Sequence, residues 1–293
     1  MKHTFTPKKL LALFILISLV LLTIVVVVHR VRDNENGQQG ADDHTTGTDE
    51  PAISFPVIPH DTDITTDSEI VSDVTDTTPS LPIPTDIRWE PNAIHDNYVV
   101  DSETLVFASI NQPIFSGLDA DVADKIHTVL EAYCREFVRI TSDDRLMAEE
   151  AYDGSPFGFE PYERAGDFTV FIKDNVVSIR YQLFHDNGGA DSGSEVTAFT
   201  FDLTTGDRLT FADYIEKDEA FGRDYLMTVF SQMVQSAPDK YYTDALDILD
   251  DVISLHDFYL TEEGLILFVN PDVLAPSAHG IITLTVPYTE LGK

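Results

Sequence analysis

Hydrophobic and polar positions divide this chain into three stretches of different character. A predominantly apolar run of 19 residues without a charge extends from Leu10 to Val28, with Lys8 and Lys9 before it and Arg30 after it. A helix of this length can cross about 30 Å of hydrocarbon. A cleaved signal peptide is the alternative, but no small-residue cleavage pattern follows the run. We therefore expect residues 1–31 to form a short cytoplasmic tail and a single transmembrane helix.

Residues 32–95 carry almost no hydrophobic pattern. This stretch is rich in Asp, Thr, Pro, Gly and Ser and poor in large apolar side chains. Such a composition buries too little surface to fold, and repulsion among its carboxylates extends the chain. We predict a disordered acidic linker over 32–95, followed by one folded domain over 96–293.

The folded stretch shows the 3.6-residue period of amphipathic helices at three places. The first is 119–137, the second is 219–233, and a shorter candidate covers 245–252. Cys134, the single cysteine, falls within the apolar stripe of the first helix, which predicts a buried thiol. The apolar positions of the first helix are Val122, Ile126, Val129, Leu130, Tyr133, Cys134 and Phe137.

Strand patterns occupy most of the remaining domain. We predict strands over 98–109, 168–172, 176–181 and 196–203, and two final strands that frame a turn at Gly264 and run through Gly280 to Val286. Asp174-Asn175 is expected to be a two-residue hairpin turn, because both residues tolerate positive φ. These elements predict an α+β fold in which two or three helices pack on one side of a largely antiparallel sheet.

The chain is strongly acidic, with 51 Asp and Glu residues against 18 Lys and Arg, a net charge of −33. Residues 96–293 alone contain 37 acidic and 12 basic residues. Such a charge repels nucleic acids and anionic lipid head groups and attracts basic proteins. An acidic surface that only keeps the protein soluble is the alternative reading.

No catalytic motif is apparent in the sequence. None of the nine histidines lies within five residues of another, and no phosphate loop, nucleophile elbow or dinucleotide fingerprint occurs. Paired carboxylates such as Asp143-Asp144 are expected by chance in so acidic a chain. The closest polar constellation is His185 and Asp186 with Asp191 and Glu195, to which we expect His279 to come close in space. We predict no catalytic residues, no metal site and no cofactor.

Several short segments of the domain recur in one known family. From about Tyr98 to the carboxyl terminus the chain resembles the RsiV-like extracytoplasmic domain, which occurs in lysozyme-sensing membrane anti-sigma factors and ahead of the catalytic domain in some peptidoglycan deacetylases. The resemblance covers nearly the whole folded stretch. The matching segments are Pro113-Ile114-Phe115-Ser116-Gly117, Gly188-Gly189-Ala190, Phe201-Asp202-Leu203-Thr204-Thr205-Gly206, Tyr259-Leu260-Thr261, Leu274-Ala275-Pro276 and Val286-Pro287-Tyr288.

The chain also departs from that family at informative positions. Relatives usually have a histidine after the Gly-Gly-Ala turn, where this chain has Asp191, and tyrosines around the later Ala-Pro turn, where it has Asp272 and Ser277. The nine residues before the apolar run are too few for a sigma-binding domain, and no deacetylase region follows. We therefore expect neither the sigma-factor binding nor the peptidoglycan deacetylation that these relatives carry out.

The resemblance and the charge together imply a binding module. We expect a single-pass protein of the bacterial cell membrane, with its amino terminus in the cytoplasm and its bulk outside. The implied partners are lysozyme, another cationic protein or peptidoglycan, with no nucleic acid. A cell-wall-modifying hydrolase domain and a structural envelope protein without ligand are the alternatives. The candidate ligand-binding residues are His185, Asp186, Gly188, Gly189, Asp191, Ser277 and His279.

Overall fold

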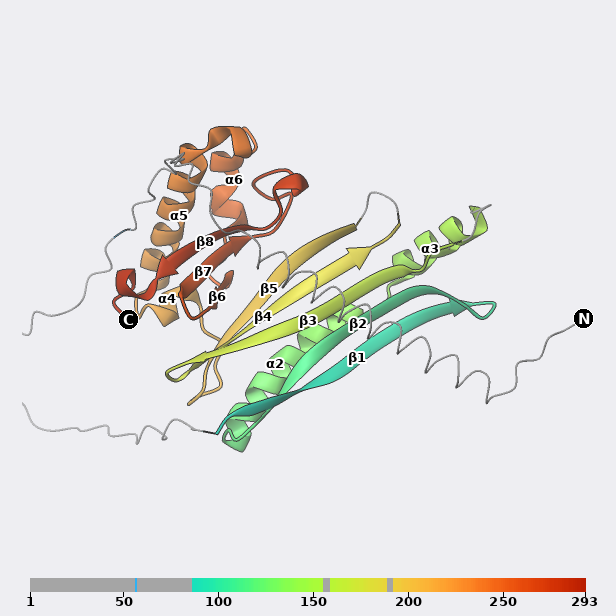
Figure 1. Ribbon diagram of the computed structural model, residues 1–293, viewed down its shortest axis with the longest axis horizontal. Coiled ribbons are helices and arrows are strands. Elements are labelled where there is room, and N and C mark those ends of the chain that lie inside the picture. Colours follow the sequence, from blue (N-terminus) through green and yellow to red (C-terminus); the bar gives the residue numbers. More distant parts are fainter. Residues whose placement is uncertain (1–55, 57–85, 155–158, 189–191) are drawn as a thin grey trace, which may run out of the picture. The chain divides into compact units, whose positions relative to one another are not determined.

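Two β-sheets, each accompanied by helices, make up the folded part of the chain (Figure 1). The computed structural model describes residues 56, 86–154, 159–188 and 192–293, all within one structural unit, Pro51–Lys293. The expected anchor over 1–31 and most of the expected linker over 32–95 lie outside the described residues. Among the described residues, no helix is long and apolar enough to cross a membrane.

The larger sheet has five strands in sequential order. They are β1 (Arg88–Val100), β2 (Glu103–Ser116), β3 (Tyr162–Lys173), β4 (Val176–Asp186) and β5 (Ser192–Asp202). Every neighbouring pair is antiparallel except β2 and β3, which pair in parallel. A parallel pair requires a crossover connection, and the two helices between β2 and β3 provide it. The sheet is therefore mixed rather than wholly antiparallel.

The first hairpin corrects two expectations. The residues 98–109 are not the single strand that was predicted but parts of two strands, because Asp101 and Ser102 adopt positive φ values of 49° and 74° and turn the chain between β1 and β2. Strand β1 also begins at Arg88, within the range that the sequence assigned to the linker. Most of β1 is exposed, so its residues show little of the alternation that marks a half-buried strand. The hairpin turn at Asp174-Asn175 is confirmed, with Asp174 at φ 53°.

The first predicted helix is confirmed as α2 (Ala120–Val138). Asp119 caps it by accepting a hydrogen bond from the backbone N–H of Asp121, a common way to satisfy the free donors of a first turn. The Cys134 thiol is fully buried and its Sγ lies 3.5 Å from Tyr181 Oη. The buried face of α2, which packs against the sheet, consists of Val122, Ile126, Leu130, Cys134 and Val138.

A second crossover helix, α3 (Ser142–Gly154), was not predicted. Two of its large apolar residues, Leu146 and Met147, are exposed, so no clear hydrophobic stripe marks the helix in the sequence. Asp144, whose pairing with Asp143 was expected by chance, accepts hydrogen bonds from Thr141 and forms an ion pair with Arg164 at 3.0 Å. These contacts fix the start of α3 against β3.

The smaller sheet is antiparallel, in the order β6 (Phe258–Leu260), β7 (Gly264–Val269) and β8 (Ile282–Pro287). Its core is shared with three helices: α4 (Phe211–Tyr214), α5 (Glu219–Ser236) and α6 (Ala245–Val252). The helices predicted near 219–233 and over 245–252 are thus confirmed, as is the α+β class. Short 3₁₀ turns lie at Pro238–Lys240, Ser277–His279 and Tyr288–Glu290.

Buried polar contacts join the two sheets. Ser178 Oγ of β4 lies 3.1 Å from Thr200 Oγ1 and accepts the backbone N–H of Leu260 in β6 at 3.0 Å. Farther along, the side-chain amide of Asn270 accepts from Val196 N at 2.8 Å and donates to Val196 O at 2.9 Å. The smaller sheet is therefore held against the face of β3 to β5 that α2 does not cover.

The outer edge of β5 is largely covered by other parts of the chain. The backbone N–H of Asp202 donates to Asp207 O, that of Leu209 donates to Thr200 O, and Arg208 donates to Ala198 O. Asn270 then occupies the edge at Val196. Coverage by described residues ends there, so the start of β5 is left as a short open edge.

Candidate functional site

A cavity of about 480 Å³ lies beside the open start of β5. Two segments far apart in sequence form its walls: the end of β4 with the start of β5, and the connection between β7 and β8. It is lined by His185, Ser192, Gly193, Ser194, Glu195, Pro271, Asp272, Ser277, Gly280 and Ile281. The turn that contains His185 and the connection that contains Ser277, both of which supplied candidate ligand-binding residues, therefore meet at one site.

The β7–β8 connection is fixed in place by its own side chains. Asn270 holds its start against β5 through the paired hydrogen bonds to Val196. Asp272, at φ 62°, accepts the backbone N–H of Ser277 at 2.7 Å and the hydroxyl of Tyr242 at 3.3 Å. Partial burial and the neighbouring Asp272 carboxylate raise the pKa of Tyr242. The loop wall of the cavity is thus organised before any ligand binds.

The other wall depends on a glycine. His185 of β4 is paired with Gly193 of β5 in the sheet register, and its imidazole lies over the glycine. A Cβ at position 193 would be 2.7 Å from His185 Cε1, closer than such atoms come in folded proteins. The absence of a side chain at Gly193 therefore sets the position of the imidazole in the cavity.

The remaining predicted site residues are placed differently. Asp186 accepts the backbone N–H of Gly188 at 2.8 Å, so its carboxylate shapes the turn. His279 lies in the Ser277–His279 turn, where it is exposed and does not line the cavity. Gly189 and Asp191 lie outside the described residues. Of the predicted residues, His185 and Ser277 line the cavity together, and Glu195 from the same constellation joins them.

Sequence reasoning missed several lining residues. Ser192 and Ser194 were not among the predicted site residues, although both line the cavity at the open start of β5. The segment Asn270-Pro271-Asp272 carries a turn signal that could have marked the second wall. Nothing local in the sequence shows that this turn meets β5, because the contact joins residues more than 70 positions apart.

The chemistry of the cavity suits recognition of hydrogen-bond donors and positive charge. Glu195 and Asp272 supply carboxylates, Ser192, Ser194 and Ser277 supply hydroxyls, and His185 supplies an imidazole. Within residues 86–154, 159–188 and 192–293, no group of three or more His, Cys, Asp or Glu side chains is placed to hold a metal ion. Carboxylates and hydroxyls at such a site accept hydrogen bonds from amines, guanidinium groups and sugar hydroxyls.

Comparison with known proteins finds similarity to one domain family over part of the chain. No curated protein sequence matches the chain. A crystal structure of a DUF3298 family member from Bacteroides fragilis NCTC 9343 aligns with a TM-score of 0.47 and 17% identity, covering 70% of this chain and 92% of that one. Another, of a DUF3298 family protein from Pseudomonas aeruginosa PAO1, aligns with a TM-score of 0.42 and 16% identity, covering 73% and 94%. Residues 208–289, which include the β7–β8 wall of the cavity, match the family described as "Protein of unknown function (DUF3298)".

Proposed function

We propose that the chain is a membrane-anchored binding module on the outer side of the bacterial cell membrane, and that its partner is a basic protein. Lysozyme, which relatives with the resembling domain sense, is the first candidate. In this proposal the cavity beside β5 receives a basic side chain of the partner.

One observation carries the proposal: two polar loops converge on a preorganised cavity with carboxylates in its walls. Glu195 is exposed on one wall, and Asp272 is held by the backbone of Ser277 on the other. The surrounding domain adds an excess of negative charge, with 37 acidic against 12 basic residues over 96–293. Long-range attraction speeds the encounter with a basic protein, and the cavity supplies the specific contacts.

The proposal is tested by calorimetric titration of the full chain, in neutral detergent, with lysozyme at low and at near-physiological salt. Contact at a defined site is saturable and survives the screening of exposed charges, whereas diffuse attraction does not. A parallel assay follows lysis of bacterial walls by the same enzyme. We expect binding that persists at near-physiological salt and protection of the walls.

Two charge reversals separate the site from the overall charge. Glu195→Lys lies in the cavity, and Glu150→Lys lies on exposed α3; both change the net charge equally. We expect Glu195→Lys to weaken binding by about tenfold or more, and Glu150→Lys by about twofold or less, because a rim charge acts mainly through steering. Equal effects of the two variants, or binding that vanishes with salt, would overturn the proposal and direct the search to wall glycans.

A further inference from the structure

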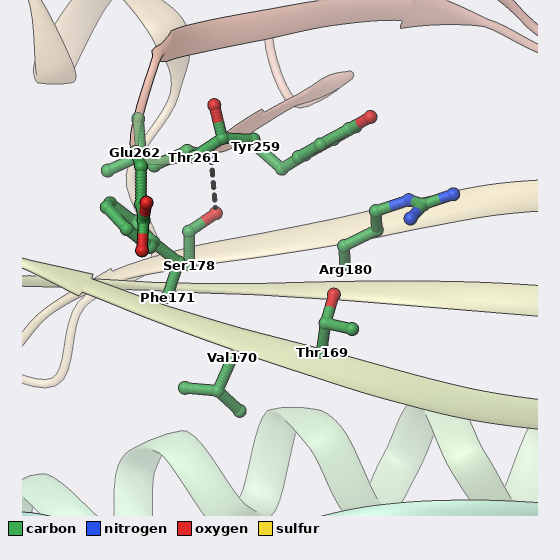
Figure 2. Close-up of a pocket in the computed structure, with 9 residues that line it drawn as sticks. Thr169, Val170, Phe171, Ser178, Arg180, Tyr259, Thr261 and Glu262 are labelled. Carbon is green, nitrogen blue, oxygen red and sulfur yellow. Dashed lines mark hydrogen bonds between the residues drawn. The ribbon is translucent and has the colours of Figure 1, made fainter. Parts of the chain in front are cut away.

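A second cavity, of about 230 Å³, lies between the two sheets and away from the site beside β5 (Figure 2). Its floor is formed by β3 and β4 of the larger sheet, and its roof by β6 and the turn after it. The lining residues are Thr169, Val170, Phe171, Ser178, Arg180, Tyr259, Leu260, Thr261 and Glu262. Neither the sequence patterns nor the proposed function assigns a role to this cavity.

Arg180 is the basic residue of the cavity, and its guanidinium is incompletely satisfied. One nitrogen, Nη2, donates to Gln182 Oε1 at 2.6 Å, and the guanidinium carbon lies 5.3 Å from the centre of the Tyr259 ring. Nε is buried and has no hydrogen-bond acceptor among the described residues. Figure 2 shows Arg180 and Tyr259 extending in the same direction from facing strands, with Thr169 beside Arg180.

Five of the eight arginines within the described residues form an ion pair with a carboxylate, and Arg180, like Arg145 and Arg208, does not. Arg164 pairs with Asp144, Lys173 with Asp174 and Arg223 with Asp250, whereas no carboxylate within the described residues lies within 4.0 Å of Arg180. A buried donor without an acceptor costs about 1–3 kcal/mol. Buried donors of this kind are uncommon in native structures, and a ligand, an ion or a water is one source of the acceptor.

We propose that this cavity binds a small carboxylate-bearing ligand, held by Arg180. A guanidinium presents its N–H groups as a planar fork that matches the two oxygens of a carboxylate. The Thr169 hydroxyl lies on the adjacent strand, and the Tyr259 ring lies 5.3 Å from the guanidinium carbon on the other side of the cavity. The proposal does not rest on the proposed function, because it concerns a different cavity and a ligand of opposite charge.

The size and the far wall of the cavity restrict the ligand further. A volume of 230 Å³ corresponds to about eight water molecules at roughly 30 Å³ each, which suits a hydroxy acid or amino acid rather than a chain of sugars. Glu262 also lines the cavity, so a second negative charge on the ligand is disfavoured there. The favoured class is a monocarboxylate with a hydroxyl or amino group.

The test uses L-lactate as the probe and lactamide, its uncharged amide, as the matched control. The full chain, labelled with ¹⁵N-arginine and held in neutral detergent, is titrated with each compound while the arginine Nε–H resonances are recorded. The Arg180 signal is the one lost in Arg180→Lys. We expect lactate at millimolar concentration to shift this signal saturably and lactamide to leave it unchanged. Lactate that shifts no Nε–H signal, or all of them alike, overturns the proposal.

Two further variants guard against a loss of binding that merely reflects misfolding. Glu262→Gln removes the negative charge from the cavity and should tighten lactate binding about two- to fivefold, a gain that an unfolded protein cannot show. Arg88→Gln, which alters an exposed arginine on β1, should leave lactate binding unchanged. Unchanged affinity in Glu262→Gln would show that lactate does not bind beside Glu262 and would overturn the assignment of the ligand to this cavity. Lysozyme binding should be unaffected by Glu262→Gln, so failure of one proposal is distinguishable from failure of the other.

Discussion

Two contacts between pairs of residues set the geometry of the cavity beside β5. The imidazole of His185 takes its place because Gly193 opposite it has no side chain, and Asp272 holds a positive φ because its carboxylate binds the backbone N–H of Ser277. In both cases the two residues that interact are not neighbours in the sequence. These contacts were not predictable from the local pattern, which shows only glycines and acidic residues in polar turns.

Gly193→Ala should displace the His185 ring while leaving the fold intact. The new Cβ would meet His185 Cε1 at 2.7 Å, and the ring can swing aside because it is the end of a side chain. We expect the free energy of unfolding to change by less than about 1 kcal/mol, since alanine also restricts the unfolded chain. Denaturant unfolding and the imidazole NMR signals of His185 measure both effects, with Ser194→Ala as control. Unshifted His185 signals would contradict this account.

Asp257 gives the domain a dependence on pH of unusual sign. Burial raises the pKa of its carboxyl to about 6, against the opposing influence of Arg208. The folded state therefore binds this proton more tightly than the unfolded state, whose pKa is about 3.9. The contribution of this proton to the free energy of unfolding is complete below about pH 4 and is lost as the pH rises through about 6.

Asp257→Asn should remove that dependence. Relative to the original chain, we expect the variant to gain about 2 kcal/mol in the free energy of unfolding at about pH 7 and nothing at about pH 4, because each unit of pKa shift corresponds to about 1.4 kcal/mol. Urea unfolding at the two pH values measures the difference. Asp251→Asn, which alters an exposed carboxyl, is the control. A variant that is less stable than the original chain at pH 7 would show that the attraction between the Asp257 carboxylate and Arg208 outweighs the cost of burying the charge.

Helices and turns that are marked by contiguous residues could be predicted from the sequence, whereas features that depend on distant residues could not. Helices α2, α5 and α6 and the Asp174-Asn175 turn were predicted because their stripes and turn residues are contiguous in sequence. Strand β1 and helix α3 were missed because most of β1 and the Leu146-Met147 pair are exposed. The parallel pairing of β2 with β3 depends on a crossover of two helices, which no single window of sequence displays.

Asn270 links the β7–β8 connection to strand β5, and its replacement tests how much this contact stabilises the domain. Asn270→Ala removes both hydrogen bonds to Val196 and leaves the Val196 N–H and C=O without partners. We expect a loss of about 2 kcal/mol in the free energy of unfolding and faster hydrogen exchange at the Val196 amide. Asn92→Ala on exposed β1 is the matched control. Unchanged exchange at Val196 would show that the β7–β8 connection is held by other contacts.

At the scale of the whole molecule, the large negative charge lowers the stability of the folded state. A net charge of −33 makes the folded chain repel itself, because folding brings the carboxylates closer together. Composition alone was enough to predict this property. It could not predict that a guanidinium would lie without a carboxylate partner between the two sheets, because that depends on how the sheets pack.

Salt should therefore stabilise the fold at neutral pH. Raising sodium chloride from about 50 mM to about 500 mM shortens the screening length from about 14 Å to about 4 Å. We expect the melting temperature to rise by a few degrees, measured by circular dichroism. The same titration near the pI of 4.2, where repulsion is weak, should give a smaller rise. Equal rises at the two pH values would assign the effect to general salting-out.

The covered edge of β5 has a consequence for aggregation. An open strand edge is a template on which a second molecule can add its own strand. The segment from Asp207 to Leu209 and the Asn270 amide occupy that template from Asp202 to Val196. On the opposite edge, β1 carries Pro91, which lacks a donor, beside the exposed polar residues Glu90 and Asn92. Most of the β5 edge and the β1 edge are thus protected against pairing with a second sheet, which leaves the short start of β5 as the part where a strand could add.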